Sequence, residues 1–255
     1  MRNKLAPLGC VALIVAGIHA GAYAQDTLPK GEAVLDKYVE ATGGKAAYAK
    51  VHNSSTKGRM EIAGQGVKGD LTVYGAEPSK MYSVFVIDGV GKIEEGTDGK
   101  VAWSLSALQG ARVKEGEEKA LALRAANFNN HLNWKQFYKS AETTGLETLD
   151  GKPCYKVLLT PLEGKPETQY YEKDSGLLVR QTGSVKTPMG EVPVDATVSD
   201  YRAESGILMP HLLKQSVAGQ QLLFTFASIK FNVEIANDRF DLPPEIKALL
   251  SRKEK

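Results

Sequence analysis

The spacing of apolar residues changes near residue 53 from a helical period to a strand period. Before that point the sequence predicts an amphipathic helix within residues 31–51, because apolar residues recur there at intervals of three and four. Gly43 and Gly44 interrupt this pattern, and a second short helical turn is predicted around residues 46–48. A helix with one apolar side needs another element to cover it. The residues on that side are Val34, Leu35, Tyr38, Val39 and Ala41.

Beyond residue 53 apolar and polar residues alternate, which is the pattern of strands with one buried face. Asp-Gly pairs at 88–89, 98–99 and 150–151 are typical of hairpin turns. Because successive strands are joined by short connections, we expect an antiparallel sheet. The clearest alternations are Met60/Ile62, Leu71/Val73 and Tyr82/Val84/Val86.

Residues 115–140 interrupt the strands with a helical pattern. Leu121 and Leu123 indicate one short helix. Both this helix and a second one after it have large side chains to bury, so we expect them to cover an open face of the sheet. The second helix is indicated by Leu132, Trp134, Phe137 and Tyr138.

The last long strand changes phase in its middle. An extra residue near Ala227-Ser228, a β-bulge, places both phases on one face and bends the strand. Bending of this kind is what a barrel or a half-barrel requires. The two sets of alternating residues are Leu222, Phe224 and Phe226, then Ile229, Phe231, Val233 and Ile235.

Together these patterns predict a mostly β protein with some α-helix, built on a single curved antiparallel sheet. The turn signals divide it into about eleven strands. Such a sheet is wider than the barrels of roughly eight strands whose own side chains fill the interior. The expected architecture is therefore a half-barrel whose concave face is plugged by the N-terminal helix and the inserted helices. Concave space that remains is expected to hold a ligand.

The first 24 residues have the pattern of a secretory signal peptide. Two cations precede an apolar run at residues 11–18, and residues 22–24 form a small-residue cleavage site. The apolar run is shorter than the about 20 residues of a membrane-spanning helix. Cleavage after Ala24 is expected to leave one half-barrel domain over residues 25–255, exported to the periplasm.

Charge and cysteine content restrict the expected partners. The leader holds two of the 32 cationic residues and none of the 30 acidic ones, so the exported part balances 30 of each. This balance argues against nucleic acid or an anionic membrane surface as the main partner. Cys10 has too little apolar sequence before it to favour lipid attachment, and Cys154 is interpreted as a buried structural thiol.

The sequence contains no recognisable catalytic or metal-binding motif. No histidine has the i, i+4 partner of an HExxH helix, and no G-x-S-x-G turn occurs. Adjacent carboxylates do not oppose each other across a pocket, so they are interpreted as solvated. We therefore predict no catalytic residue, no metal, no cofactor and no enzymatic activity. The candidates set aside are His52, His131, His211, Glu94-Glu95 and Glu117-Glu118.

Four short motifs occur in order along most of the chain. They are Gly69-Asp70-Leu71, Pro78, Thr97-Asp98-Gly99-Lys100 with Trp103, and Phe240-Asp241-Leu242-Pro243-Pro244. In this order the chain resembles the LolA/LolB-like family of outer-membrane lipoprotein-sorting proteins, which are periplasmic lipoprotein carriers. The resemblance implies a half-barrel in which helices plug a hydrophobic cavity for acyl chains. Carriers of this family latch the lid with an arginine before the proline. This chain has Glu77 there, so no latch residue is carried over.

The resemblance and the width of the predicted sheet suggest a periplasmic carrier that binds a lipid or lipoprotein acyl chain. Residues 121–137 are its expected mobile cover, and a membrane-bound donor or acceptor protein is a further candidate partner of the expected monomer. The alternative is a periplasmic sensor or interaction module of the same fold without lipid transport. The residues expected to line the cavity are Leu71, Val73, Phe85, Trp103, Leu121, Trp134, Phe137, Leu222, Phe224 and Phe226.

Overall fold

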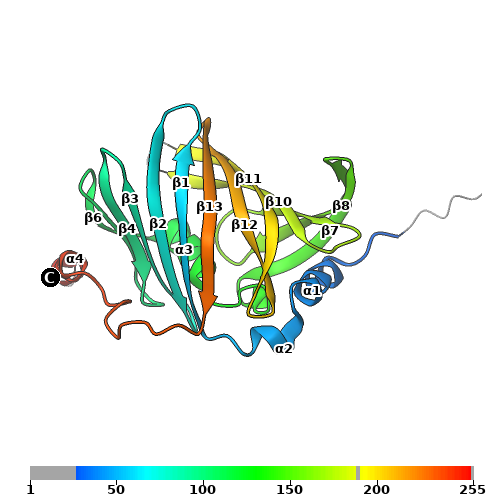
Figure 1. The fold of residues 1–255 in the computed structure, drawn as a ribbon, viewed down its shortest axis with the longest axis horizontal. Helices are drawn as coiled ribbons and strands as arrows, with labels where there is room; N and C mark the ends of the chain where they lie inside the picture. Colours follow the sequence, from blue (N-terminus) through cyan, green and yellow to red (C-terminus); the bar gives the residue numbers. More distant parts are fainter. Residues whose placement is uncertain (1–26, 188–189, 254–255) are drawn as a thin grey trace, which may run out of the picture.

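The computed structural model describes residues 27–187 and 190–253. Their strands form one open, curved antiparallel sheet of 13 strands, with helices against it (Figure 1). The prediction of a mostly β half-barrel is confirmed. The predicted leader, its cleavage after Ala24 and Cys10 lie outside the described residues. The helices are α1 (Gly31–Ala41), α2 (Gly44–Tyr48), α3 (Gly116–Ala126), the 3-10 helix η1 (Trp134–Gln136) and α4 (Pro244–Lys253).

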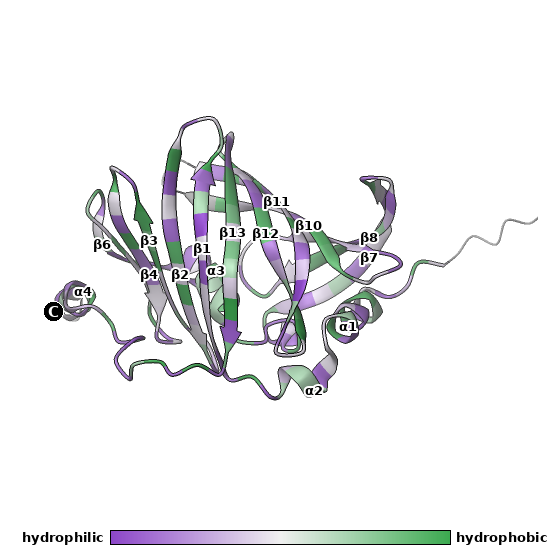
Figure 2. Ribbon diagram, viewed as in Figure 1, coloured by the Kyte–Doolittle hydropathy of each residue, from purple (hydrophilic) through white to green (hydrophobic). Residues whose placement is uncertain are grey.

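The strands run in two meanders that meet in the middle of the sheet, where β1 pairs with β13. Hydrophobic and hydrophilic residues alternate along strands on both sides of this junction (Figure 2). The first meander consists of β1 (Asn53–Ile62), β2 (Val67–Ala76), β3 (Lys80–Ile87), β4 (Gly91–Thr97), β5 (Ala102–Ser106) and β6 (Gly110–Val113). The second consists of β7 (Tyr138–Leu149), β8 (Lys152–Pro161), β9 (Glu167–Glu172), β10 (Leu178–Thr187), β11 (Gly190–Glu204), β12 (Ile207–Val217) and β13 (Gln220–Phe231).

The sheet bends sharply where the two meanders join. The register of β1 against β13 shifts by one residue between Lys57 and Gly58, which leaves Ala227 as the extra residue of a bulge. The bulge keeps the apolar residues of β13 on one face, as the change of phase predicts. Phe85 of β3 and Phe224 of β13 meet with ring centroids 6.4 Å apart. Their strands are three spacings apart, about 14 Å in a flat sheet, so the face that carries both rings is concave.

Helices α1 and α2 follow the predicted pattern. α1 packs on β7 and β8 and buries Leu35 and Tyr38 in a cluster that includes the fully buried Tyr171. Gly31 allows the helix to start directly against the edge strand, because a Cβ at this position would lie 2.3 Å from the carbonyl oxygen of Ala141. The N-terminal helix therefore covers one end of the concave face.

The connection between the meanders explains where α3 lies. β6 and β7 are the two opposite edges of the sheet, so the chain that joins them must cross one of its faces. It crosses the concave side, and α3 contacts β4 and β5 near one edge and β10 in the other meander (Figure 1). The inserted helix thus covers the trough, as expected.

Two segments differ from the sequence-based expectation. The second inserted helix is reduced to the single turn η1, and Tyr138 begins β7 instead of ending a helix. The sequence pattern predicts no helix after Pro243, yet α4 begins at Pro244 and buries Ile246 completely. Proline is tolerated in the first turn of a helix, where its missing N–H has no partner to lose. The sheet has 13 strands, against the expected number of about eleven.

Candidate ligand-binding cavity

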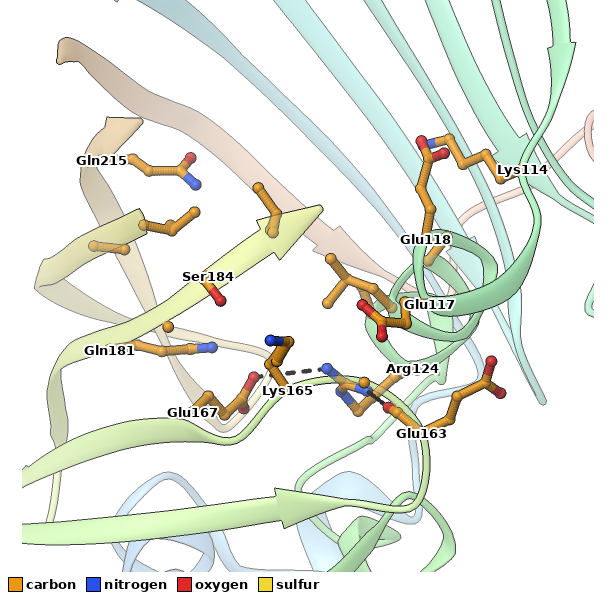
Figure 3. A pocket seen from close by; sticks show the side chains of 18 of the residues that line it. Lys114, Glu117, Glu118, Arg124, Glu163, Lys165, Glu167, Gln181, Ser184 and Gln215 are labelled. Carbon is orange, nitrogen blue, oxygen red and sulfur yellow. Dashed lines mark hydrogen bonds and ion pairs between the residues drawn. The ribbon is translucent and has the colours of Figure 1, made fainter. Parts of the chain in front are cut away.

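A cavity of about 570 Å³ lies between α3 and the concave face of the sheet, and we call it the outer chamber (Figure 3). Residues 163–167, which lead into β9, form part of its wall. The helix gives it an apolar wall of Leu121, Ala122 and Ala125. The opposite wall comes from β10, β11 and β12, through Gln181, Gly183, Val194, Ala196, Leu213 and Gln215.

The charged side chains of the outer chamber are largely paired. Lys114 Nζ lies 3.2 Å from Glu95 Oε2. Arg112 Nη2 donates to Glu118 Oε1 at 2.6 Å, which attaches the start of α3 to β6. The hydrogen bonds from Arg112 lower the pKa of Glu118, so this carboxyl remains ionised. A wall of apolar groups and neutralised charge pairs suits an amphipathic molecule.

The far end of α3 is tied to the sheet by a buried ion pair. Arg124 and Glu167 are each 9% exposed, and Nη2 lies 3.7 Å from Oε2. Tyr138 donates to Glu167 Oε1 at 2.6 Å and Gln169 donates to the same oxygen at 3.1 Å. Burial, and then the charge of Glu167, raises the pKa of Tyr138, so the phenol remains a donor. Hydrogen bonds of this kind offset the cost of burying the carboxylate.

A further contact fixes the end of α3 to the turn before β3. Asn127 Nδ2 donates to the carbonyl oxygen of Pro78 at 3.2 Å. Glu77, which stands where the carriers have their latch arginine, lies on the surface with Oε2 2.9 Å from Nδ1 of His52. The helix is thus held by its own Arg124 and by Asn127.

A second and smaller space, which we call the inner chamber, has a volume of about 40 Å³. Arg124 lines both chambers, and Asn130, His131 and Gln169 add polar atoms to the inner one. The ring of His131 packs edge-on against Tyr38, with centroids 4.7 Å apart. Most of the inner wall is aromatic or aliphatic, from Leu35, Tyr38, Trp134, Phe137, Tyr138 and Leu159.

Three of the residues expected to line a cavity do so. Leu121 lines the outer chamber, and Trp134 and Phe137 line the inner one. Six others lie on the concave face. Leu213 lines the outer chamber and pairs with Phe224 of β13, and residues paired across neighbouring strands share a face. The pairing continues from β13 through β1 and β2 to β3 and includes the six on the same face. They line neither chamber. Leu71 is buried, and the other five are partly exposed. The six are Leu71, Val73, Phe85, Leu222, Phe224 and Phe226.

Trp103 lies on the convex face, contrary to the expected placement. It pairs with Gly96, which pairs with Tyr82, and the rings of Trp103 and Tyr82 lie 6.3 Å apart. Arg239 of the C-terminal segment stacks on Tyr82 at 5.4 Å, which marks this face as the one covered by that segment. Successive strand residues point to opposite faces, so an error of one position in the assigned phase moves a side chain across the sheet.

The polar residues of the site are absent from the sequence-based set. Glu167, Gln169 and Tyr171 occupy alternate positions of β9 that are all buried. Polar residues in the buried phase of a strand are the available signal, because such groups need partners inside the protein. That signal indicates a buried network without identifying Arg124 as its partner.

Acid is expected to destabilise the protein through His131. Burial lowers the pKa of this residue to about 4, from its ordinary 6.5. Between about pH 6.5 and 5 the unfolded chain therefore binds a proton that the native chain does not, and the free energy of unfolding should fall by roughly 1.5 kcal/mol. Urea unfolding at both pH values measures this. His131→Asn should reduce the change in the free energy of unfolding between the two pH values, whereas His52→Asn, at an exposed position, should leave it as in wild type. The same change in wild type and in His131→Asn would show that His131 is not its source.

Among the described residues, no helix is long and apolar enough to cross a membrane. The same residues contain no group of three or more His, Cys, Asp or Glu side chains placed to hold a metal ion.

The chain is an open half-barrel with a helix over its concave face, and solved structures of similar form exist. The chain is similar to a DUF1329 family protein from Desulfovibrio piger, with a TM-score of 0.59 and 16% identity over 84% of this chain and 98% of that one. A LolA superfamily protein from Nitrosomonas europaea matches with a TM-score of 0.57 and 10% identity, over 84% of this chain and 99% of that one. A putative outer membrane lipoprotein-sorting protein domain from Vibrio parahaemolyticus matches with a TM-score of 0.57 and 13% identity, over 87% of this chain and 100% of that one.

These three likenesses show that the chain has a LolA-like fold. No family model matches the sequence, and no curated protein matches it.

Proposed function

We propose that this protein is a non-enzymatic carrier that binds one acyl chain of a lipid or lipoprotein in the outer chamber. The observation that carries the proposal is the chamber of about 570 Å³ between an apolar helix face and a concave sheet. A methylene group takes up about as much space as a water molecule, roughly 30 Å³. The chamber therefore has room for much of one long acyl chain.

The expected energy of such binding is sufficient for reversible carriage. Each buried methylene contributes about 0.8 kcal/mol. A chain with about ten methylenes enclosed gains roughly 8 kcal/mol, before the cost of lost motion is subtracted. No charged anchor is required, in keeping with the paired charges of the wall.

Entry and release are proposed to occur by movement of α3. The contacts that hold this helix are mainly polar: Arg112 with Glu118, Arg124 with Glu167, and Asn127 with Pro78. Water can replace polar contacts of this kind more readily than it replaces a packed apolar interface. The predicted leader, and the similarity in fold to a putative outer membrane lipoprotein-sorting protein domain from Vibrio parahaemolyticus, favour a periplasmic location and a membrane-bound donor or acceptor protein as partner.

Native mass spectrometry of the exported protein, followed by organic extraction, tests this function. We expect a co-purifying single-chain or acylated lipid, and saturable uptake of a fluorescent fatty acid by the delipidated protein. A protein that carries no lipid and takes up no fatty acid is not a carrier. Recovery of a membrane-bound partner without any lipid would instead support the sensor or interaction module.

A further inference from the structure

We infer that the inner chamber is the subsite for the methyl end of the bound chain, and that the side chain of Arg124 is the partition through which this end passes. The inference rests on the proposed function and adds a direction to it. The ligand class is a single-chain amphiphile, such as a fatty acid or a monoacyl lipid, with its polar head in the outer chamber.

The two chambers are neighbours with a single shared wall residue. Arg124 is the one residue common to the two linings. Its guanidinium contacts Glu167, the carbonyl oxygen of Glu163 at 3.5 Å and the ring of Tyr138 at 5.2 Å. The partition is thus a long flexible side chain and not backbone. Rotation of its side-chain torsions opens the partition, at the cost of separating the guanidinium from Glu167.

The inner chamber has the composition that an alkyl end requires. Leu35, Trp134, Phe137 and Leu159 supply apolar contact. Its present volume of about 40 Å³ admits only one methyl or methylene group, so it is a place for a chain end and not for a head group. His131 enters this space as a neutral ring, because burial lowers its pKa to about 4.

The outer chamber is polar and open to water along part of its wall. Lys165 Nζ lies 3.1 Å from Glu191 Oε2, and both side chains are 52% exposed. Ser184 donates to Glu191 Oε1 at 2.6 Å. Figure 3 shows Lys165 near Arg124 and Glu167, with Lys114 and Gln215 farther from Arg124. An amphiphile whose methyl end enters the mostly apolar inner chamber therefore keeps its head in the polar, partly open outer chamber.

The two tryptophans of the chain make this direction measurable. Trp134 lines the inner chamber, whereas Trp103 lies on the convex face. The Trp103→Phe protein therefore reports the inner chamber, and the Trp134→Phe protein is the matched control. The probes are two dibrominated stearic acids, one with bromine near the methyl end and one with bromine near the carboxyl.

Bromine quenches indole fluorescence at short range, so the probe whose bromine lies nearer to Trp134 quenches it more. We expect the methyl-end probe to quench Trp103→Phe about twofold or more above the carboxyl-end probe, with no such difference in Trp134→Phe. The same comparison between wild type and Trp134→Phe gives the result if Trp103→Phe folds poorly. Binding of each probe is followed independently by native mass spectrometry.

The possible failures are distinguishable. If both probes bind but quench Trp134 equally, or the carboxyl-end probe quenches more, the inner chamber does not receive the chain end, while the carrier function stands. If neither probe binds, the proposed carrier function fails, and the inference fails with it.

Discussion

Tryptophan in place of Ala196 is expected to lower fatty-acid affinity about 100-fold. Ala196 lies on β11 in the wall of the outer chamber, facing α3 with Leu213 and Gln215. An indole at this position covers about 200 Å² and takes the place of several methylenes of the ligand. The loss of about four of them, at about 0.8 kcal/mol each, corresponds to roughly 3 kcal/mol. Titration with a fluorescent fatty acid measures the change.

The next residue on the strand provides a matched control. Thr197 lies on the other face of β11, is exposed, and lines an outer groove away from the chamber. Thr197→Trp adds the same aromatic ring to the same strand, so it should leave the affinity unchanged. Equal loss of binding in both variants, or full binding by a folded Ala196→Trp, would show that the ligand does not occupy the outer chamber.

Replacement of Arg124 by methionine is expected to reduce the free energy of unfolding by about 3 to 5 kcal/mol. The substitution leaves the Glu167 carboxylate buried without its cation, although Tyr138 and Gln169 still donate to it. Urea unfolding measures the loss. A second substitution, Glu167→Gln, should recover much of it, because the unpaired charge is then gone.

The control for this prediction is an exposed ion pair near the same chamber. Lys165 and Glu191 are each 52% exposed, so Lys165→Met should cost less than about 1 kcal/mol. A loss of similar size in Arg124→Met, with no recovery in the double variant, would mean that the buried pair does not hold α3.

Local patterns along the chain predicted much of the fold. The helical spacing of Leu35 and Tyr38 correctly identified the buried side of α1, and the change of phase after Phe226 correctly placed the bulge in β13. Both predictions depend on residues close in sequence, whose side-chain directions follow directly from helix or strand geometry.

Predictions failed where one local pattern fits two structures. Trp134, Phe137 and Tyr138 have the spacing of a helix, but the last of them begins an edge strand that pairs with Pro161. Trp103 belongs to a strand, as predicted, yet its face depends on pairing with Gly96. In each case the contact that decides the structure is made with a residue outside the local pattern, so the local pattern cannot predict it.

The amino-acid pattern alone determines that this chain forms a curved, mostly β sheet with a helix inserted in its middle, because periodicity and turn residues act locally. Only the tertiary structure decides that the sheet edges lie so that α3 must cross the concave face. It also decides that Arg124 meets Glu167 there, and that Phe85 and Phe224 meet on the concave face while a chamber remains under α3. These features arise from strand order and curvature, which bring together residues far apart in the sequence.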